Sequence, residues 1–164
     1  MFSAQPSASP HEATAQPGSR WATARQQTLR ATIVWSHDLL TPPERALFRR
    51  LAVFAGGCDL EAAGAVGVAG GDPGVALLDG IASLVDASLL GQTQGLDGEP
   101  RFWMLETVRE FALERLASSE EEAIVRRAHA DLCLSLAAAG ARGLRGPDVW
   151  RVSFGLASLR PPFL

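Results

Sequence analysis

Apolar residues recur with a helical period from about residue 26 onward. The pattern predicts a first helix that ends near Thr41. Residues 1–25 are rich in Pro, Ser, Ala and Gln and have no apolar period. Such a segment buries too little apolar surface to offset the entropy of folding, so we expect a disordered leader there. The apolar positions of the first helix are Leu29, Ile33, Trp35, Leu39 and Leu40.

A second helix is predicted to begin at Thr41, where three start signals coincide. The Thr41 hydroxyl can cap the helix, two prolines occupy its first turn, and Glu44 completes a capping box. Gly56 and Gly57 stop the segment. Its large apolar side chains recur at the spacing of a buried stripe, so we expect them in the core. They are Leu47, Phe48, Leu51 and Phe54.

Two aspartates mark the predicted starts of the next two helices. Asp59 can cap a short helix over residues 60–63, which a glycine-rich link follows. Asp72, with Pro73 behind it, predicts the start of a longer helix that runs to about Ala87. This longer helix is amphipathic. Its apolar positions are Leu77, Leu78, Ile81, Leu84 and Val85.

A β-hairpin and two more helices complete the pattern. Residues 88–92 and 101–104 flank the turn-rich segment 94–100, as in a hairpin with a longish loop. A helix is predicted from about Glu106, and residues 118–122 can cap another. The inner faces of these two helices are Val108, Phe111, Ala112 and Leu116, and Val125, Ala128, Leu132 and Leu136.

Helices followed by a two-stranded wing are typical of a winged helix. We therefore predict a mainly α fold with a winged-helix domain over residues 26–117, best defined from Thr28 to Ala117. Residues 118–142 are predicted to form the first helix of a helical-repeat array. Residues 143–164 lack a clear period and are expected to form an irregular tail.

The charge pattern argues against direct DNA binding. The 164-residue chain contains 15 basic residues, all arginine, and 18 acidic residues, for a formal net charge of −3. The helix expected to face DNA contains Asp72, Asp79 and Asp86 and no arginine. The wing tip carries Asp97 and Glu99, with arginine only at its base. Both elements would bring negative charge toward phosphate.

Five separated phrases carry a resemblance to a known family. They are RQQTLRATI (25–33), WS (35–36), DLL (38–40), FRRLAVFAGG (48–57) and MLETVREFA (104–112). In this order they resemble the winged-helix segment behind the nucleotide-binding domain of bacterial STAND (NB-ARC-type) transcriptional regulators of the LuxR and SARP kinds. The resemblance covers roughly Arg25 to Leu136. It implies a longer protein with a P-loop ATPase switch, a helical-repeat sensor and a separate DNA-binding domain.

The same resemblance directs attention to Leu105. Relatives carry Met-His-Asp at the start of the helix after the wing, and this chain has Met-Leu-Glu at residues 104–106. The histidine can donate a hydrogen bond to a bound diphosphate, whereas the Leu105 side chain has no donor. One interpretation is that nucleotide sensing is lost or replaced. We favour the other, in which Leu105 is an apolar residue that packs under the wing.

Catalytic and metal-binding patterns are not evident in the sequence. The phosphate-binding motif GxxxxGK[ST] requires a lysine, which the chain lacks, so we expect neither an ATPase nor a bound cofactor. Cys58 and Cys133 have no CxxC motif or Cys/His cluster beside them, and we expect core or surface thiols and no metal. His37 is expected on a helix surface, and His129 on the surface or partly buried. Glu106, Glu110 and Glu114 are expected to form a solvated, ion-paired helix face.

These observations lead to one functional hypothesis and two alternatives. We expect a non-catalytic coupling module of a STAND-type regulator, in a fragment without the P-loop and DNA-binding domains. Its expected partner is the ATPase domain or another protein domain. The alternatives are an autonomous winged-helix DNA-binding regulator and a protein-interaction adaptor. With no apolar run long enough to span a membrane and no signal-peptide pattern, we expect a cytoplasmic protein.

Overall fold

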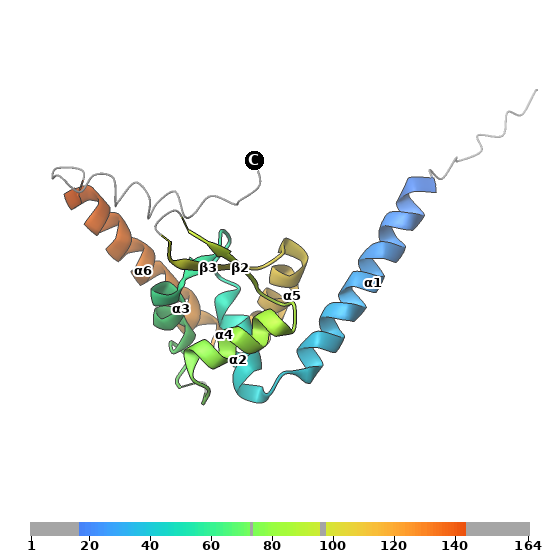
Figure 1. The fold of residues 1–164 in the computed structure, drawn as a ribbon, viewed down its shortest axis with the longest axis horizontal. Coiled ribbons are helices and arrows are strands. Elements are labelled where there is room, and N and C mark those ends of the chain that lie inside the picture. The colour runs from blue at the N-terminus through green and yellow to red at the C-terminus, as the bar shows by residue number, and fades with distance from the viewer. Residues whose placement is uncertain (1–16, 73, 96–97, 144–164) are drawn as a thin grey trace, which may run out of the picture.

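A computed structural model describes residues 17–72, 74–95 and 98–143 of the chain, as six helices and three short strands (Figure 1). The predicted mainly α, winged-helix fold is confirmed. In chain order the elements are α1 (Pro17–Leu39), α2 (Pro42–Leu51), β1 (Cys58–Asp59), α3 (Leu60–Gly67), α4 (Leu77–Asp86), β2 (Gly91–Gln94), β3 (Pro100–Trp103), α5 (Glu106–Ala117) and α6 (Glu122–Gly143).

The three strands form one antiparallel sheet in the order β1-β3-β2. Strand β3 is central, with Phe102 opposite both Cys58 of β1 and Gln92 of β2. The predicted hairpin is therefore present, although β2 begins at Gly91 and β3 already at Pro100. Strand β1 was not predicted, because two residues are too short to show an alternating pattern. Helices α2 to α4 followed by β2 and β3 give the helix-turn-helix and wing arrangement.

Helix α2 lies at the centre of the core and contacts α3, α4 and α5. Its predicted apolar stripe is confirmed, since Leu47, Phe48 and Leu51 are buried. Phe54 is also buried, although it follows the end of the helix. Val125 of α6 belongs to the same core cluster, and α6 packs on α3.

Local capping explains where α2 and α3 begin. The Glu44 carboxylate accepts hydrogen bonds from the N–H (2.7 Å) and the hydroxyl (2.8 Å) of Thr41. Asp59 accepts a 2.8 Å bond from the N–H of Ala62 and caps α3, as predicted. The prediction for Asp72 is wrong, because α4 begins only at Leu77.

The glycines around Asp72 account for this difference. Gly71 and Gly74 have φ angles of +102° and +76°, in the region that favours glycine. The chain therefore turns at this point, and Asp72 accepts a 2.9 Å hydrogen bond from the N–H of Gly74. The side chain stabilises a turn and is not the N-cap of α4.

Helix α1 is longer than the sequence pattern indicated. It begins at Pro17, so the expected leader is helical over residues 17–25, and the rest of that leader lies outside the described residues. In Figure 1, α1 (blue) extends away from the other helices, and it contacts α5. Ile33 is buried, but Trp35 is 65% exposed, so Trp35 is not a core residue. The expected tail beyond residue 143 also lies outside the described residues.

Candidate nucleic-acid interface

Helix α4 occupies the position of the second helix in the helix-turn-helix pair. Ile81 and Leu84 bury its inner face in the core. Its outer face exposes Asp79, Asp86 and Leu78, the last at 62% exposure. The helix contains no basic residue. As the sequence indicated, the outer face of α4 offers carboxylates and apolar surface but no positive charge.

The wing presents uncharged polar side chains. Strand β2 lies at the edge of the sheet, and Gln92, Thr93 and Gln94 are all exposed. The hairpin closes through a 2.8 Å hydrogen bond from the N–H of Gly95 to the carbonyl of Glu99. Glu99 is exposed, as expected for an acidic tip, whereas Asp97 lies outside the described residues. The strand itself therefore offers amide and hydroxyl groups, and the carboxylate lies at its tip.

The base of the wing is held by close contacts. The Trp103 indole lies against Gly91, where an added Cβ would come within 2.4 Å of the ring. Gly57 has a φ of +85°, and a Cβ there would lie 2.4 Å from the Phe102 carbonyl oxygen. These glycines let the chain and the indole approach the sheet closely.

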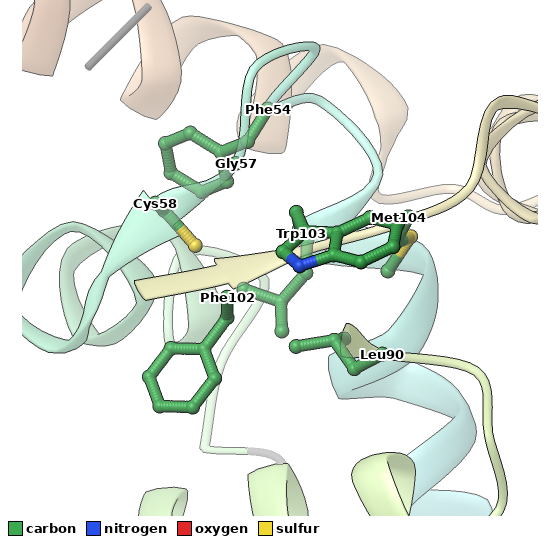
Figure 2. Close-up of a pocket in the computed structure, with 8 residues that line it drawn as sticks. Phe54, Gly57, Cys58, Leu90, Phe102, Trp103 and Met104 are labelled. Carbon is green, nitrogen blue, oxygen red and sulfur yellow. The ribbon is translucent and has the colours of Figure 1, made fainter. Parts of the chain in front are cut away.

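The space under the wing is too small for a ligand. Phe54, Cys58, Phe102 and Met104 are among the residues that line it (Figure 2). Its volume is about 10 Å³, the lower limit for a single water molecule. Burial raises the pKa of the Cys58 thiol to about 12, so the thiol stays protonated at neutral pH. Cys58 is a core thiol, one of the two outcomes expected.

Six arginines in the described part of the chain are engaged with carboxylates. Arg109, for example, donates to Glu106 at 2.7 Å on α5. Such pairs leave fewer free cations for phosphate groups. Arg30, Arg49, Arg50, Arg109, Arg126 and Arg127 each lie within 4.0 Å of a carboxylate.

The two described histidines are packed against aromatic rings. The His37 side chain is only 12% exposed, because it lies against Phe48 and Phe111, so its expected surface position is wrong. His129 stands edge-on to Phe54 at 4.9 Å and is partly buried, one of the outcomes expected. Burial lowers the pKa of both imidazoles. Both therefore favour the neutral form, as packing residues do.

The remaining predicted positions show no catalytic arrangement. Glu106 pairs with Arg109 and Glu114 with Arg30, as expected for a solvated helix face. Within the described ranges, no three His, Cys, Asp or Glu side chains gather where they could hold a metal ion.

The preferred interpretation of Leu105 is wrong. The residue is 51% exposed at the N-cap position of α5 and does not pack under the wing. Its side chain offers no hydrogen-bond donor there.

Comparison with known proteins agrees with this architecture. Residues 40–117 match the model of a winged helix-turn-helix domain family, and this part of the chain forms such a domain. No solved structure matches the chain. Among the helices of the described residues, none combines the length and apolar content needed to cross a membrane.

Relatives come from mycobacteria. Proteins named "Putative HTH-type transcriptional regulator" in Mycobacterium tuberculosis and Mycobacterium bovis are 49% identical over 121 residues, which is 74% of this chain and 14% of theirs. An "Uncharacterized protein" of M. tuberculosis is 46% identical over 104 residues, 62% of this chain and 26% of its own. The chain thus spans a small part of the length of these relatives.

These matches correct the expectation about DNA. The family model and the names of the relatives favour a DNA-binding domain, so the argument against direct DNA binding is overturned. The net charge of the chain and the acidic residues of α4 and the wing tip bear on phosphate contacts. The neutral side chains of β2 can instead form hydrogen bonds with bases. Gln92 was predicted to lie in the hairpin, but the exposed polar residues 92–94 were not predicted as a contact surface. Their uninterrupted polar run within a strand was the available signal.

Proposed function

We propose that this chain carries the DNA-binding winged helix-turn-helix domain of a longer transcriptional regulator. The observation that supports this best is the arrangement of α2, α3 and α4 followed by the β2–β3 wing, within the residues that match the domain family. The names of the mycobacterial relatives support the same proposal. The domain acts by binding and not by catalysis, and it works as part of a protein longer than this chain.

The charge distribution sets how such binding would depend on salt. Each phosphate that a protein neutralises on duplex DNA adds about 0.9 to the slope of log affinity against log salt. Here the outer face of α4 has no cation, and six arginines of the described residues are paired with carboxylates. We therefore expect few phosphate contacts and a slope of about 2 or less.

Fluorescence anisotropy with the 164-residue chain tests the proposal. A pool of labelled duplexes with random sequence is titrated at low ionic strength and again at physiological salt. Saturable binding with a shallow salt slope is expected. Absence of binding to every duplex at low salt, from a chain that circular dichroism shows to be folded, would contradict it. The variant Leu47→Asp, which puts a charge in the core, is the unfolded control.

A second candidate is that the same domain couples an ATPase to the rest of a STAND-type regulator. The exposed Leu78, next to Asp79 on α4, favours it, because an apolar residue beside a charge suits a protein contact. The test is calorimetric titration of the chain with a purified STAND ATPase domain. We expect the two proteins to bind. Leu78→Asp should abolish this binding, and Leu134→Asp, at a similarly exposed position on α6, should leave it intact. No heat of binding would count against it.

A further inference from the structure

Strand β2 combines three features that suit contact with base edges. It is an edge strand, so one side of its backbone is not paired within the sheet. Its three consecutive polar residues, 92–94, are exposed. None of these three is charged. The described part of the ribbon also holds one carboxylate, Glu99 at the tip, and one cation, Arg101, so its formal charge is zero, whereas that of α4 is −2. The Gln94 amide donates a hydrogen bond to the Gly98 carbonyl that is long, at 3.4 Å, and leaves the side chain readily available.

The spacing of the two glutamines matches that of stacked bases. Side chains alternate along a strand, so Gln92 and Gln94 point to the same side, about 6.8 Å apart along β2. This is about twice the 3.4 Å rise per base pair of duplex DNA. A glutamine amide can donate to N7 and accept from N6 of adenine at the same time, in the major groove. The pair can therefore reach bases two steps apart.

Helix α4 is poorly suited to the same groove. Asp79 and Asp86 are seven residues apart and both exposed, so they lie on one side, two turns from each other. In the major groove they would lie between two rows of phosphates with no cation on the helix to offset them. The groove is about 12 Å wide and admits a two-stranded ribbon as readily as a helix.

We infer that the β2–β3 ribbon, and not α4, enters the major groove, and that Gln92 and Gln94 select A·T base pairs there. The inference rests on the proposed DNA binding and specifies its geometry. It assigns sequence preference to the wing, while α4 stays outside the groove with its carboxylates in solvent.

Two short duplexes, one of A·T pairs only and one of G·C pairs only, test the inference with the full chain. We expect tighter binding to the A·T duplex. Gln92→Ala and Gln94→Ala should each weaken A·T binding roughly tenfold, as expected for loss of one bidentate base contact, and leave G·C binding unchanged. The matched control is Gln26→Ala, an exposed glutamine on α1, which should change neither. Asp79→Asn should not weaken binding.

A third duplex identifies the groove. Replacing adenine by 7-deazaadenine removes the N7 acceptor from the major groove and leaves the minor groove intact, so wild-type binding should fall to the level of the glutamine variants. Binding that persists unchanged in both glutamine variants, or with 7-deazaadenine, overturns the inference while the proposed DNA binding stands. Absence of binding to any duplex overturns both.

Discussion

Arg50 is 2% exposed, and its guanidinium holds the Glu121 carboxylate through two hydrogen bonds, of 2.6 and 3.2 Å. The same guanidinium donates to the carbonyls of Gly67 (2.6 Å) and Gly71 (2.7 Å). One side chain of α2 therefore ties the end of α3 and the following turn to the segment between α5 and α6. Arg49 adds a third bond to Glu121, at 3.0 Å.

Removal of Glu121 should be costly, because it leaves a buried cation without its counter-charge. We expect Glu121→Ala to lower the free energy of unfolding by about 3 kcal/mol. Arg50→Met, which fills a similar volume without charge, should cost less, and the double variant should be more stable than Glu121→Ala alone. Urea unfolding followed by circular dichroism measures all three. The control is Glu122→Ala, which removes the pair of Glu122 with Arg126 on α6. If Glu121→Ala lowers the free energy of unfolding by no more than Glu122→Ala does, the buried pair does not have this role.

The same pair predicts a dependence of stability on pH. The hydrogen bond from Arg50 is the main reason that the pKa of Glu121 lies below its ordinary value of 4.5. The unfolded chain then binds a proton more readily than the folded one, so stability rises with pH in this range. The contribution of the Arg50–Glu121 pair to stability is complete above pH 4.5 and is lost as pH falls through the lowered pKa of Glu121. Unfolding free energies of Glu121→Gln should decline less steeply on acidification than those of wild type. Equal declines would exclude this role.

Helix α6 is predicted to be part of the domain's folding unit, beyond the end of the family match at residue 117. Val125 is fully buried in the core, and Glu121 precedes α6. Val125→Ala should lower the free energy of unfolding by about 2 kcal/mol, and a chain ending at residue 117 should melt at a lower temperature than one ending at residue 143. Exposed Ile124→Ala is the control. Equal melting temperatures for the two chains would show that α6 is dispensable.

Gly57 and Gly71 make a matched pair for testing the close approach at the sheet. Both have positive φ, but an added Cβ meets the Phe102 carbonyl at Gly57 and nothing within 4 Å at Gly71. Backbone strain is common to both positions, so the difference isolates the steric clash. Gly57→Ala should cost about 1–3 kcal/mol more than Gly71→Ala in denaturant unfolding. Comparable losses would mean that the clash is relieved without cost.

The two cysteines should differ in reactivity. Burial raises the pKa of the Cys58 thiol to about 12, so its thiolate is scarce at neutral pH, whereas Cys133 is partly exposed. A maleimide reagent should label the folded chain at Cys133 and both cysteines in denaturant, as mass spectrometry would show. Rapid labelling of Cys58 in the folded chain would contradict its buried position.

Features set by short stretches of sequence were predictable. Thr41 with Glu44, and Asp59 before its short helix, specify their helix starts through hydrogen bonds between neighbours in the chain. Asp72 has the same local pattern, but adjacent glycines with positive φ turn the chain, and α4 starts later. A residue type alone does not reveal which φ a glycine adopts.

Features set by contacts between distant segments were not predictable. His37 is polar and was assigned to the surface, yet contacts with Phe48 and Phe111, from two other helices, bury it. Strand β1 exists because Cys58 pairs with Phe102 far along the chain. In the candidate interface, the acidic character of α4 followed from the sequence. The exposure of residues 92–94 on β2 could not be predicted, because it depends on the position of this strand at the edge of the sheet.

Nuclear magnetic resonance of the labelled 164-residue chain, titrated with A·T duplex at low ionic strength, tests the central claim most directly. If the winged helix binds DNA through its wing, the side-chain amide signals of Gln92 and Gln94 should shift saturably, and those of Gln26 and Gln27 on α1 should not. Signals throughout the domain that remain unchanged at every duplex concentration would contradict the claim that this domain binds DNA.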